Sequence, residues 1–449
     1  MKNRFKMAIL FLIIILFIII VIIGLRIGLA VKANANIIYK GITINGIDVS
    51  LLNMEQAIEK IKQNSDIVNE NRKISVNVEE KSYNTSFVRL KVRENIEEVV
   101  KIALYYGKSD DILKRYKWIK YGIIKDFTTS ITLDAEEFKE FLKNIEKEQN
   151  IASVDATIDH QWGEFRITPH EIGRSIDRYE LKKNIENQIE ESKDGVDISS
   201  EAMFIKEYPK IMDSDIKSIN SLISSYTTGF INSSSARCKN IEIAAKSIDN
   251  TVVLPGEEFS FNNIVGMATS SKGYQYAKVI KNGIFIEEVG GGICQVSSTL
   301  YNAVLKSRFS ISERRNHSKV ISYVPRGQDA MISYGVSDLK FVNTFNYPIL
   351  IETIVANKEI TINIFSNKNE SGTNYEVVSE VGKLINPKKE IIYDYGLREG
   401  TVIIQQQGEV GYVIDTYRVL YKNGKLVEKI KVGESIYQGK NIIIRKGKD

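Results

Sequence analysis

Apolar positions dominate the start of the chain, where residues 7–25 form an uncharged run that Lys2, Arg4 and Lys6 precede. At about 1.5 Å of rise per residue, this run is long enough to cross a bilayer core as a helix. Cations on its N-terminal side favour a cytoplasmic N-terminus. We therefore predict a cytoplasmic tip and transmembrane anchor over residues 1–30, which places the chain in the cell membrane as a single-pass protein with an extracytoplasmic soluble part.

A cleaved secretory signal is the alternative interpretation of the N-terminus, because Ala33-Asn34-Ala35 offers a small-residue cleavage pattern. The apolar run is longer than the usual core of a signal peptide, and Arg26 and Lys32 separate it from that pattern. Length therefore favours the anchor, and export is expected under either interpretation.

Two later segments share one pattern at an offset of about 80 residues. Residues 74–104 and 154–189 each alternate as two strands and then take the spacing of a helix. We predict two β/α repeats, over residues 37–130 and 131–212.

The pattern changes near residue 213. Apolar residues have helical spacing over residues 216–223 and 241–248, whereas residues 320–324 and 331–334 are typical of strands. This mixture predicts an α+β domain over residues 213–368.

The C-terminal residues 372–449 indicate β structure throughout, and Asn423-Gly424 between two alternating runs predicts a hairpin turn. The expected fold class is therefore α+β and multidomain. An N-terminal transmembrane helix is followed by β/α repeats, an α+β domain and a small all-β module.

Composition mainly excludes classes of partner and of stabilising chemistry. A formal net charge of +5 over 449 residues, without a basic cluster, gives no reason to expect nucleic acid as a partner. Two cysteines, Cys238 and Cys294, cannot build a disulfide framework. His160, His170 and His317 lie too far apart in the sequence to suggest a metal cluster, so neither a metal site nor a cofactor is predicted.

The segment most suited to chemistry starts at three consecutive glycines, Gly290, Gly291 and Gly292, which leave the backbone free to approach a ligand. Apolar residues at every fourth position then predict a helix that begins at or next to Cys294. A thiol at the positive end of a helix has a lowered pKa and is a better nucleophile. The helix amides could also hold an oxyanion during acyl transfer.

A histidine and two aspartates follow this thiol. His317 precedes a predicted strand, and Asp329 and Asp338 flank the next one. Cysteine on a helix followed by histidine and aspartate is the order of papain-like and transglutaminase-like sites, in which the acid orients the base. The structural alternatives are a buried apolar Cys294, a disulfide between Cys294 and Cys238, and a His317 that only caps or hydrogen-bonds.

Several motifs occur together between residues 233 and 365. They include Pro255-Gly-Glu-Glu-Phe-Ser-Phe-Asn262, Gly273-Tyr274, Gly290-Gly-Gly-Ile-Cys-Gln-Val-Ser-Ser-Thr-Leu-Tyr-Asn-Ala303, Glu313-Arg314, His317-Ser318, Tyr323-Val324, Gly327, Asp329-Ala330, Asp338-Leu-Lys-Phe341 and Asn343. Together they closely resemble the VanW family, which is named for an accessory gene of glycopeptide (vancomycin) resistance clusters. The resemblance implies work at the cell wall but no defined reaction.

The flanking segments carry looser resemblances. The repeats are similar to peptidoglycan-binding domains, and the C-terminal module is similar to a glycine-marked wall-binding β module, which together imply peptidoglycan as a partner. The family pattern carries possible catalytic roles onto Cys294, His317, Asp329 and Asp338, and ligand-binding roles onto Gly290, Gly291, Gly292, Gln295, Thr299 and Arg314.

Two hypotheses follow for the function. One is a membrane-anchored, extracytoplasmic protein that binds peptidoglycan and serves envelope maintenance. The other is a thiol-dependent peptidase, amidase or transpeptidase that acts on stem peptides through Cys294 and His317. The second requires the Cys294 sulfur to lie within about 4 Å of a His317 nitrogen in a cleft.

Overall fold

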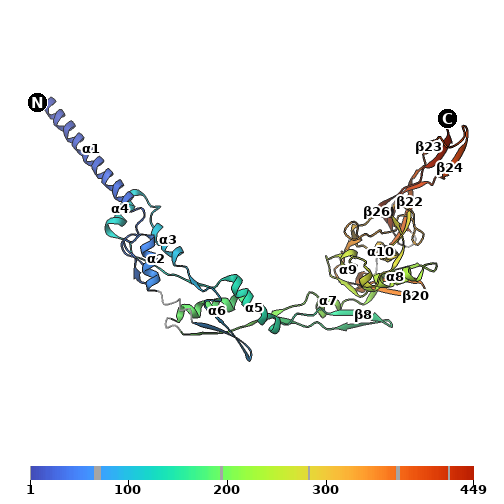
Figure 1. Cartoon of the computed structure of the whole chain (residues 1–449), viewed down its shortest axis with the longest axis horizontal. Coiled ribbons are helices and arrows are strands. Elements are labelled where there is room, and N and C mark those ends of the chain that lie inside the picture. The colour runs from blue at the N-terminus through green and yellow to red at the C-terminus, as the bar shows by residue number, and fades with distance from the viewer. Residues whose placement is uncertain are drawn as a thin grey trace. The chain divides into compact units, whose positions relative to one another are not determined.

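The computed structural model describes residues 2–64, 72–192, 196–281, 284–370, 375–422 and 425–448. The chain divides into two compact units (Figure 1). The N-terminal unit comprises Met1–Ser153 and Ile172–Tyr208, and the C-terminal unit comprises Val154–Glu171 and Pro209–Asp449. The α+β, multidomain fold class is confirmed.

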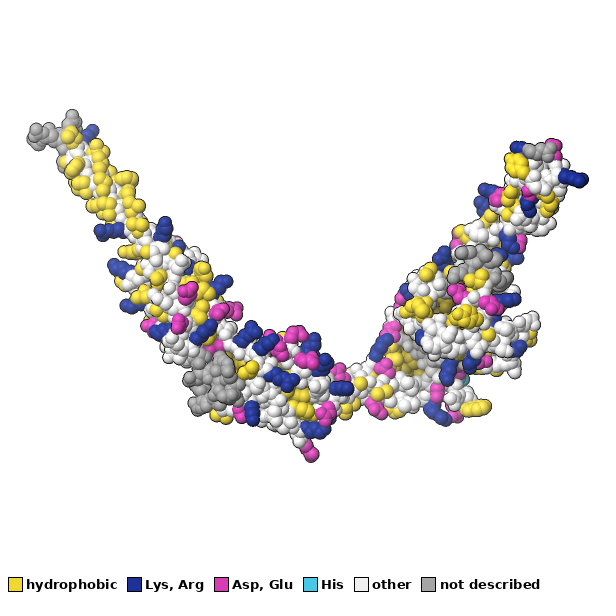
Figure 2. Space-filling model, viewed as in Figure 1, with side chains coloured by type: hydrophobic (Ala, Val, Ile, Leu, Met, Phe, Trp, Pro, Cys, Tyr) yellow, Lys and Arg dark blue, Asp and Glu magenta, His cyan; other side chains and the backbone are white. Residues whose placement is uncertain are grey.

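A single long helix, α1 (Lys2–Ala33), opens the N-terminal unit. The most apolar 18-residue window of its segment Lys6–Ala33 has a mean hydropathy of 3.7 and buries none of its residues. Figure 2 shows these apolar side chains as an almost continuous surface along the helix. By length and composition α1 could cross a membrane, and a signal sequence would have the same features.

Two small cores follow in this unit. In the first, the sheet β2-β1-β6 packs with helices α2, α3 and α4 around buried residues such as Ile42 and Val100. In the second, the sheet β11-β3-β4 packs with α5 and α6 around Ile74 and Leu142. The elements are β1 (Ile42–Ile44), β2 (Ile47–Asp48), α2 (Met54–Gln63), β3 (Lys73–Val78), β4 (Lys81–Ser86), β5 (Arg93–Glu94), α3 (Ile96–Tyr105), α4 (Ile112–Tyr121), β6 (Lys125–Phe127), β7 (Ile131–Thr132), α5 (Ala135–Gln149), β10 (Gly173–Ile176), α6 (Arg178–Glu191), β11 (Ile198–Glu201) and β12 (Phe204–Glu207).

The centre of the C-terminal unit is the antiparallel sheet β13-β21-β20-β14, on which helices α8 and α10 pack. The core between them buries apolar residues of α10 such as Val296 and Leu300 against Ile362 and Ile364 of β21. The elements are α7 (Asp213–Ile216), β13 (Ser221–Gly229), α8 (Ser235–Ile248), β14 (Thr251–Val253), β15 (Glu258–Ser260), α9 (Phe261–Val265), η1 (Ser270–Lys272), β16 (Tyr276–Lys281), β17 (Ile284–Val289), α10 (Ile293–Leu305), β18 (Ser310–Glu313), β19 (Lys340–Val342), β20 (Ile349–Ala356) and β21 (Glu359–Ser366).

One hairpin, β8 (Thr157–Gln161) and β9 (Glu164–Thr168), belongs to the C-terminal unit although the chain on both sides of it belongs to the other unit. Its residues Ala156 and Ile158 share a buried cluster with Leu350 of β20 and Phe365 of β21. The two predicted repeats therefore contain the expected order of two strands and a helix, but their hairpins pack in different units.

The last part of the chain is all-β. It forms the sheets β22-β25-β26 and β23-β27-β24. The elements are η2 (Lys368–Glu370), β22 (Glu376–Ile385), β23 (Lys389–Asp394), β24 (Val402–Gln406), β25 (Gly411–Lys422), β26 (Lys425–Tyr437) and β27 (Ile442–Gly447). The predicted turn at Asn423-Gly424 lies outside the described residues, whereas the antiparallel pairing of β25 with β26 is present.

Three element predictions are wrong. Residues 216–223 are not a helix, because Ile216 ends α7 and β13 begins at Ser221. Their helical spacing arises because the apolar side chains serve two different cores. Residues 320–324 and 331–334 form irregular loops rather than strands. Side-chain hydrogen bonds hold this region in place of strand pairing, as where Ser297 donates to the carbonyl of Ala330.

Candidate functional site

The site begins at the glycine loop before α10. Gly292 is the N-cap residue of the helix with φ of 113°, a conformation that favours glycine. A Cβ on Gly291 would lie 2.6 Å from the carbonyl oxygen of Ala277. The helix starts at Ile293, so Cys294 lies in its first turn, as predicted. The amide of Cys294 makes no hydrogen bond within the described residues, which leaves a donor beside the sulfur.

The structure brings His317 and Asp329 to this thiol. The His317 Nδ1 atom lies 2.6 Å from Asp329 Oδ2, and the His317 backbone amide donates to the same oxygen at 2.6 Å. The Cys294 thiol and the His317 ring lie close enough for each to shift the pKa of the other, and the Cys294 sulfur also lies 3.6 Å from the carbonyl oxygen of Ile332. A thiol, a histidine and an orienting acid thus lie together, contributed by α10 and by the loops that follow it in the chain.

Burial shifts the pKa values of Cys294 and His317 in one direction, and the interactions between the charged groups shift them in the other. Burial alone would raise the pKa of Cys294, but the hydrogen bond and positive charge of His317 hold it below the usual 9.0. Burial alone would lower the pKa of His317, yet its hydrogen bonds with Asp329 and Cys294 raise it to about 9. Both shifts favour a thiolate beside an imidazolium over a neutral thiol beside a neutral imidazole.

The Cys294 sulfur opens onto a cavity of about 1340 Å³. Arg237 lines it and donates to Gln295 Oε1 at 2.8 Å. Tyr323 also lines it, and burial together with the nearby Cys294 charge raises the pKa of this phenol, which keeps it a neutral donor. Lys278 and Arg315 add further positive charge to the lining. The cavity is large enough for a short peptide and suits an acyl group with a nearby anionic substituent.

The C-terminal β module also supports the site. The Tyr437 hydroxyl of β26 donates to Asp329 Oδ1 at 2.5 Å. Arg314 donates to the same oxygen at 3.2 Å and to Ser435 Oγ at 2.7 Å. The Asp329 carboxylate thereby has donors on both oxygens, which fixes the face that it presents to His317.

The remaining predicted residues take other positions. Asp338 accepts hydrogen bonds from Ser260 Oγ and from the Asn262 and Leu339 amides, so it is not the acid that contacts His317. Thr299 is buried and hydrogen-bonds with Thr228, outside the cavity lining. Gln295 lines the cavity, but its amide nitrogen is held by Thr228 and by the Gly229 carbonyl.

Among the glycines and the cations, Gly290 and Gly292 line the cavity, whereas Gly291 and Arg314 support it from behind. Cys238 and Cys294 are both free thiols, so the disulfide alternative does not occur in this structure.

Sequence reasoning missed Arg237 and Tyr437 as parts of the site. Arg237 lies in the first turn of α8 and carries no motif of its own, although the buried face of that helix was predicted. Tyr437 is 108 residues away from Asp329 in an alternating strand, and such a pattern carries no sign of a distant partner. Tyr323 had a signal, since it is one of the residues that resemble the VanW family.

The comparisons with known families describe a modular, cell-wall-associated protein that contains a VanW-like region. Residues 236–365 match the family model described as VanW like protein, residues 83–197 match the peptidoglycan-binding domain 4 family, and residues 376–449 match the G5 domain. The chain thus contains a VanW-like region and both of the flanking modules expected from its sequence.

Two curated relatives support this assignment. The chain is 44% identical over 161 residues to the uncharacterized protein YoaR of Bacillus subtilis (strain 168), which covers 36% of this chain and 53% of YoaR. It is 28% identical over 191 residues to the vancomycin B-type resistance protein VanW of Enterococcus faecalis (strain ATCC 700802 / V583), which covers 41% of this chain and 66% of that protein. The chain thus spans between half and two thirds of the length of these relatives.

Among solved structures, the IgA1 protease G5 domain is 26% identical to this chain, with a TM-score of 0.14 over 18% of this chain and 98% of that domain.

Proposed function

We propose that this protein carries out thiol-dependent acyl transfer on peptide amide bonds of peptidoglycan, as a peptidase, amidase or transpeptidase of stem peptides. The observation that supports this proposal is that Cys294, at the start of α10, and His317, which is hydrogen-bonded to Asp329, both line one large cavity. The domain matches supply the substrate class, because both flanking modules are of wall-associated types.

The Cys294 thiolate would attack the amide carbonyl carbon and form a tetrahedral oxyanion beside the Cys294 amide, with the Arg237 guanidinium nearby. His317 would donate its proton to the departing amine as the carbon–nitrogen bond breaks, which leaves a thioester. Neutral His317 would then take a proton from water or from an acceptor amine, whose attack releases the acyl group and restores the thiol. Asp329 keeps the imidazole ring in the required orientation throughout.

The N-terminal helix gives this chemistry a location. We place α1 in the cell membrane as a single-pass anchor, with the remainder of the chain in the extracytoplasmic space. The apolar surface of α1 and the cations that precede it support this placement. A role in envelope maintenance, with a link to glycopeptide resistance, follows from the VanW relative.

The test is to incubate purified peptidoglycan sacculi with the full-length protein in detergent and to analyse the released and retained muropeptides by mass spectrometry. The native protein and Cys238→Ser should alter the muropeptides. Cys294→Ala should not, and His317→Asn should lose activity by about 100-fold or more.

The second candidate is a scaffold that binds peptidoglycan without altering it, and the peptidoglycan-binding and G5 matches favour this alternative. Sacculi that retain both native protein and Cys294→Ala, with identical muropeptides, would overturn the enzymatic proposal and support the scaffold.

A further inference from the structure

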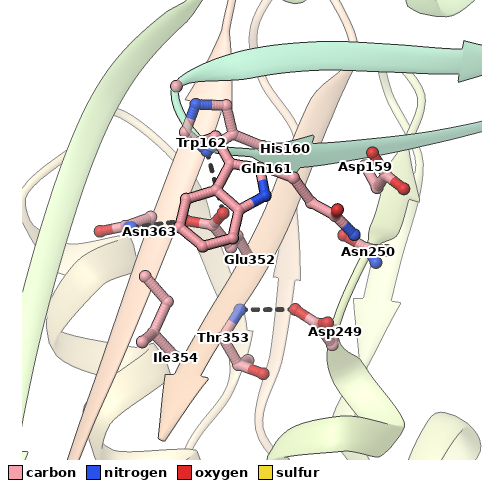
Figure 3. A pocket seen from close by; sticks show the side chains of 11 residues that line it. Asp159, His160, Gln161, Trp162, Asp249, Asn250, Glu352, Thr353, Ile354 and Asn363 are labelled. Carbon is pink, nitrogen blue, oxygen red and sulfur yellow. Dashed lines mark hydrogen bonds and ion pairs between the residues drawn. The ribbon is translucent and has the colours of Figure 1, made fainter. Parts of the chain in front are cut away.

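A second cavity, of about 410 Å³, lies in the C-terminal unit and shares no lining residue with the cavity at Cys294. Its walls come from the β8–β9 hairpin, from β20 and β21, and from the end of α8 (Figure 3). The hairpin therefore does not merely cover the sheet but completes a concave site on it.

The floor of this cavity is a fixed polar group. His160 Nδ1 lies 2.9 Å from Glu352 Oε1, and Asn363 Nδ2 donates to Glu352 Oε2 at 2.7 Å. The His160 ring also packs against Phe165 and Phe365, with centroid distances of 4.8 and 4.5 Å. These contacts hold the hairpin on the sheet and make the shape of the cavity permanent.

Trp162 stands at the rim, at the turn of the hairpin. Its side chain is 99% exposed, so it gains no burial from its position. Its φ is 57° and that of Gly163 is 85°, a pair of values that a two-residue hairpin turn usually meets with Asn-Gly or Asp-Gly. A large aromatic residue here serves neither the turn nor the core, which indicates a binding role.

The polar lining narrows the class of ligand. Three carboxylates, from Asp159, Asp249 and Glu352, line the cavity, and none of the eleven lining residues is Lys or Arg. An anionic ligand is therefore disfavoured. Among the described residues, no group of three or more His, Cys, Asp or Glu side chains could hold a metal ion. A neutral ligand rich in hydroxyl donors fits this lining.

Hydrogen-bonding groups remain available beside the indole. Within the described residues, the side chains of Gln161 and Asn250 make no hydrogen bond, and one buried oxygen of Asp159 has no partner. Figure 3 shows these three side chains at the same opening as the Trp162 ring. Carboxylate oxygens accept from hydroxyl groups, and carboxamides both donate and accept.

We propose that this cavity is a saccharide-binding subsite, in which one pyranose ring of a β-1,4-linked N-acetylhexosamine chain stacks on Trp162. Ring hydroxyls donate to Asp159 and Asp249, and Gln161 and Asn250 hydrogen-bond with the acetamido group or the next hydroxyls. The proposal rests on the proposed wall function only for the choice of sugar, and it does not depend on thiol chemistry. It would place a glycan site where the β8–β9 hairpin, which lies within the peptidoglycan-binding match, packs on the VanW-like region.

The probe is chitotetraose, a β-1,4-linked tetramer of N-acetylglucosamine, titrated into full-length protein in a detergent without a sugar headgroup. The chain has two tryptophans, so Trp118→Phe leaves Trp162 as the sole indole reporter. Binding should shift and quench its emission, with a Kd that calorimetry confirms. Trp162→Asn should raise the Kd about tenfold or more, because the stacking surface is lost while asparagine suits the turn.

The matched control is Tyr179→Ala, which removes another exposed aromatic side chain, on α6, and should leave the Kd unchanged. Circular dichroism and thermal melting establish that each variant is folded. Emission of Trp162 that does not respond to millimolar chitotetraose, or equal affinity in Trp162→Asn, overturns the proposal. The muropeptide assay on the same preparations reports the thiol chemistry separately, so either proposal can fail alone.

Discussion

At the scale of single residues, Asp329 determines the state of the thiol site. One of its oxygens accepts two hydrogen bonds from His317, and the other accepts from Tyr437 and Arg314. Burial alone would raise the pKa of Asp329, but the His317 hydrogen bond and the Arg314 charge lower it. The carboxylate thus stays ionised and keeps His317 protonated beside Cys294.

This ion pair predicts an unusual pH dependence of alkylation. In a Cys238→Ser background, the rate at which iodoacetamide modifies Cys294 should fall by less than about threefold from pH 8 to pH 6, because the His317 cation favours the thiolate. His317→Asn removes the cation that lowers the Cys294 pKa. The alkylation rate of Cys294 in the His317→Asn variant should fall by about 100-fold from pH 8 to pH 6. Mass spectrometry of the alkylated peptide measures both rates, and a native protein as steep as the variant would contradict the ion pair.

The sequence identified the thiol and the histidine, but it could not choose between the two aspartates. Asp329 and Asp338 both flank one predicted strand, and only the fold shows that Asp338 is used by Ser260 and the amides next to it. The contact of Tyr437 with Asp329 could not be predicted for a different reason. Its partner lies in another module, and local periodicity reports which face of a strand is buried but not what lies against it.

At the scale of elements, the position of α10 depends on the close approach of the glycine loop to its neighbours. The Gly291 carbonyl accepts from Asn240 of α8 at 3.0 Å, and a Cβ on this residue would clash with the backbone of Ala277 in β16. Glycine is needed here for space, whereas at Gly292 it is also needed for its positive φ.

Gly291→Ala should therefore lower the free energy of unfolding by about 1–3 kcal/mol, because the backbone must move to admit the methyl group. Gly229→Ala, at a position with open space around the added Cβ, is the matched control and should change it by about 1 kcal/mol or less. Urea unfolding followed by circular dichroism gives both values. Equal values for the two variants would mean that the loop can relax without cost.

Helices with a continuous apolar face were predictable, as residues 241–248 and the helix at Cys294 show. The assignment failed where neighbouring apolar residues face different cores, as at residues 216–223, since their spacing then reflects two packing partners instead of one face. The loops around His317 were mistaken for strands because their apolar residues follow a strand-like pattern. Most of these side chains are only partly buried or exposed, and hydrogen bonds such as that from Ser297 to the Ala330 carbonyl hold the backbone in place of a ladder.

At the scale of the whole molecule, the polypeptide passes between the two units three times, at Ser153, Glu171 and Tyr208. Sequence repeats suggested consecutive domains, whereas the β8–β9 hairpin leaves its neighbours in the chain and packs in the C-terminal unit. Module boundaries drawn from the sequence would cut this hairpin away from the cluster that contains Leu350 and Phe365.

A specific protease site inserted between Tyr208 and Pro209 tests this connectivity. After cleavage, the two fragments should still elute together in size-exclusion chromatography, because the hairpin remains packed on β20. Adding Ile158→Asp places a charge in the buried cluster and should release the fragments. Separation of the native fragments without this substitution would show that the hairpin contributes little.

The triple crossing also has a mechanical consequence under the proposed arrangement, in which the chain is anchored in the membrane at one end and binds the wall beyond it. Tension between the units would be shared by the three chain segments that connect them, and two of these segments lead into the β8–β9 hairpin. Trp162 stands at the tip of that hairpin. A load large enough to separate the hairpin from β20 would open the proposed saccharide cavity. The affinity for a glycan strand would therefore fall as the wall stretches.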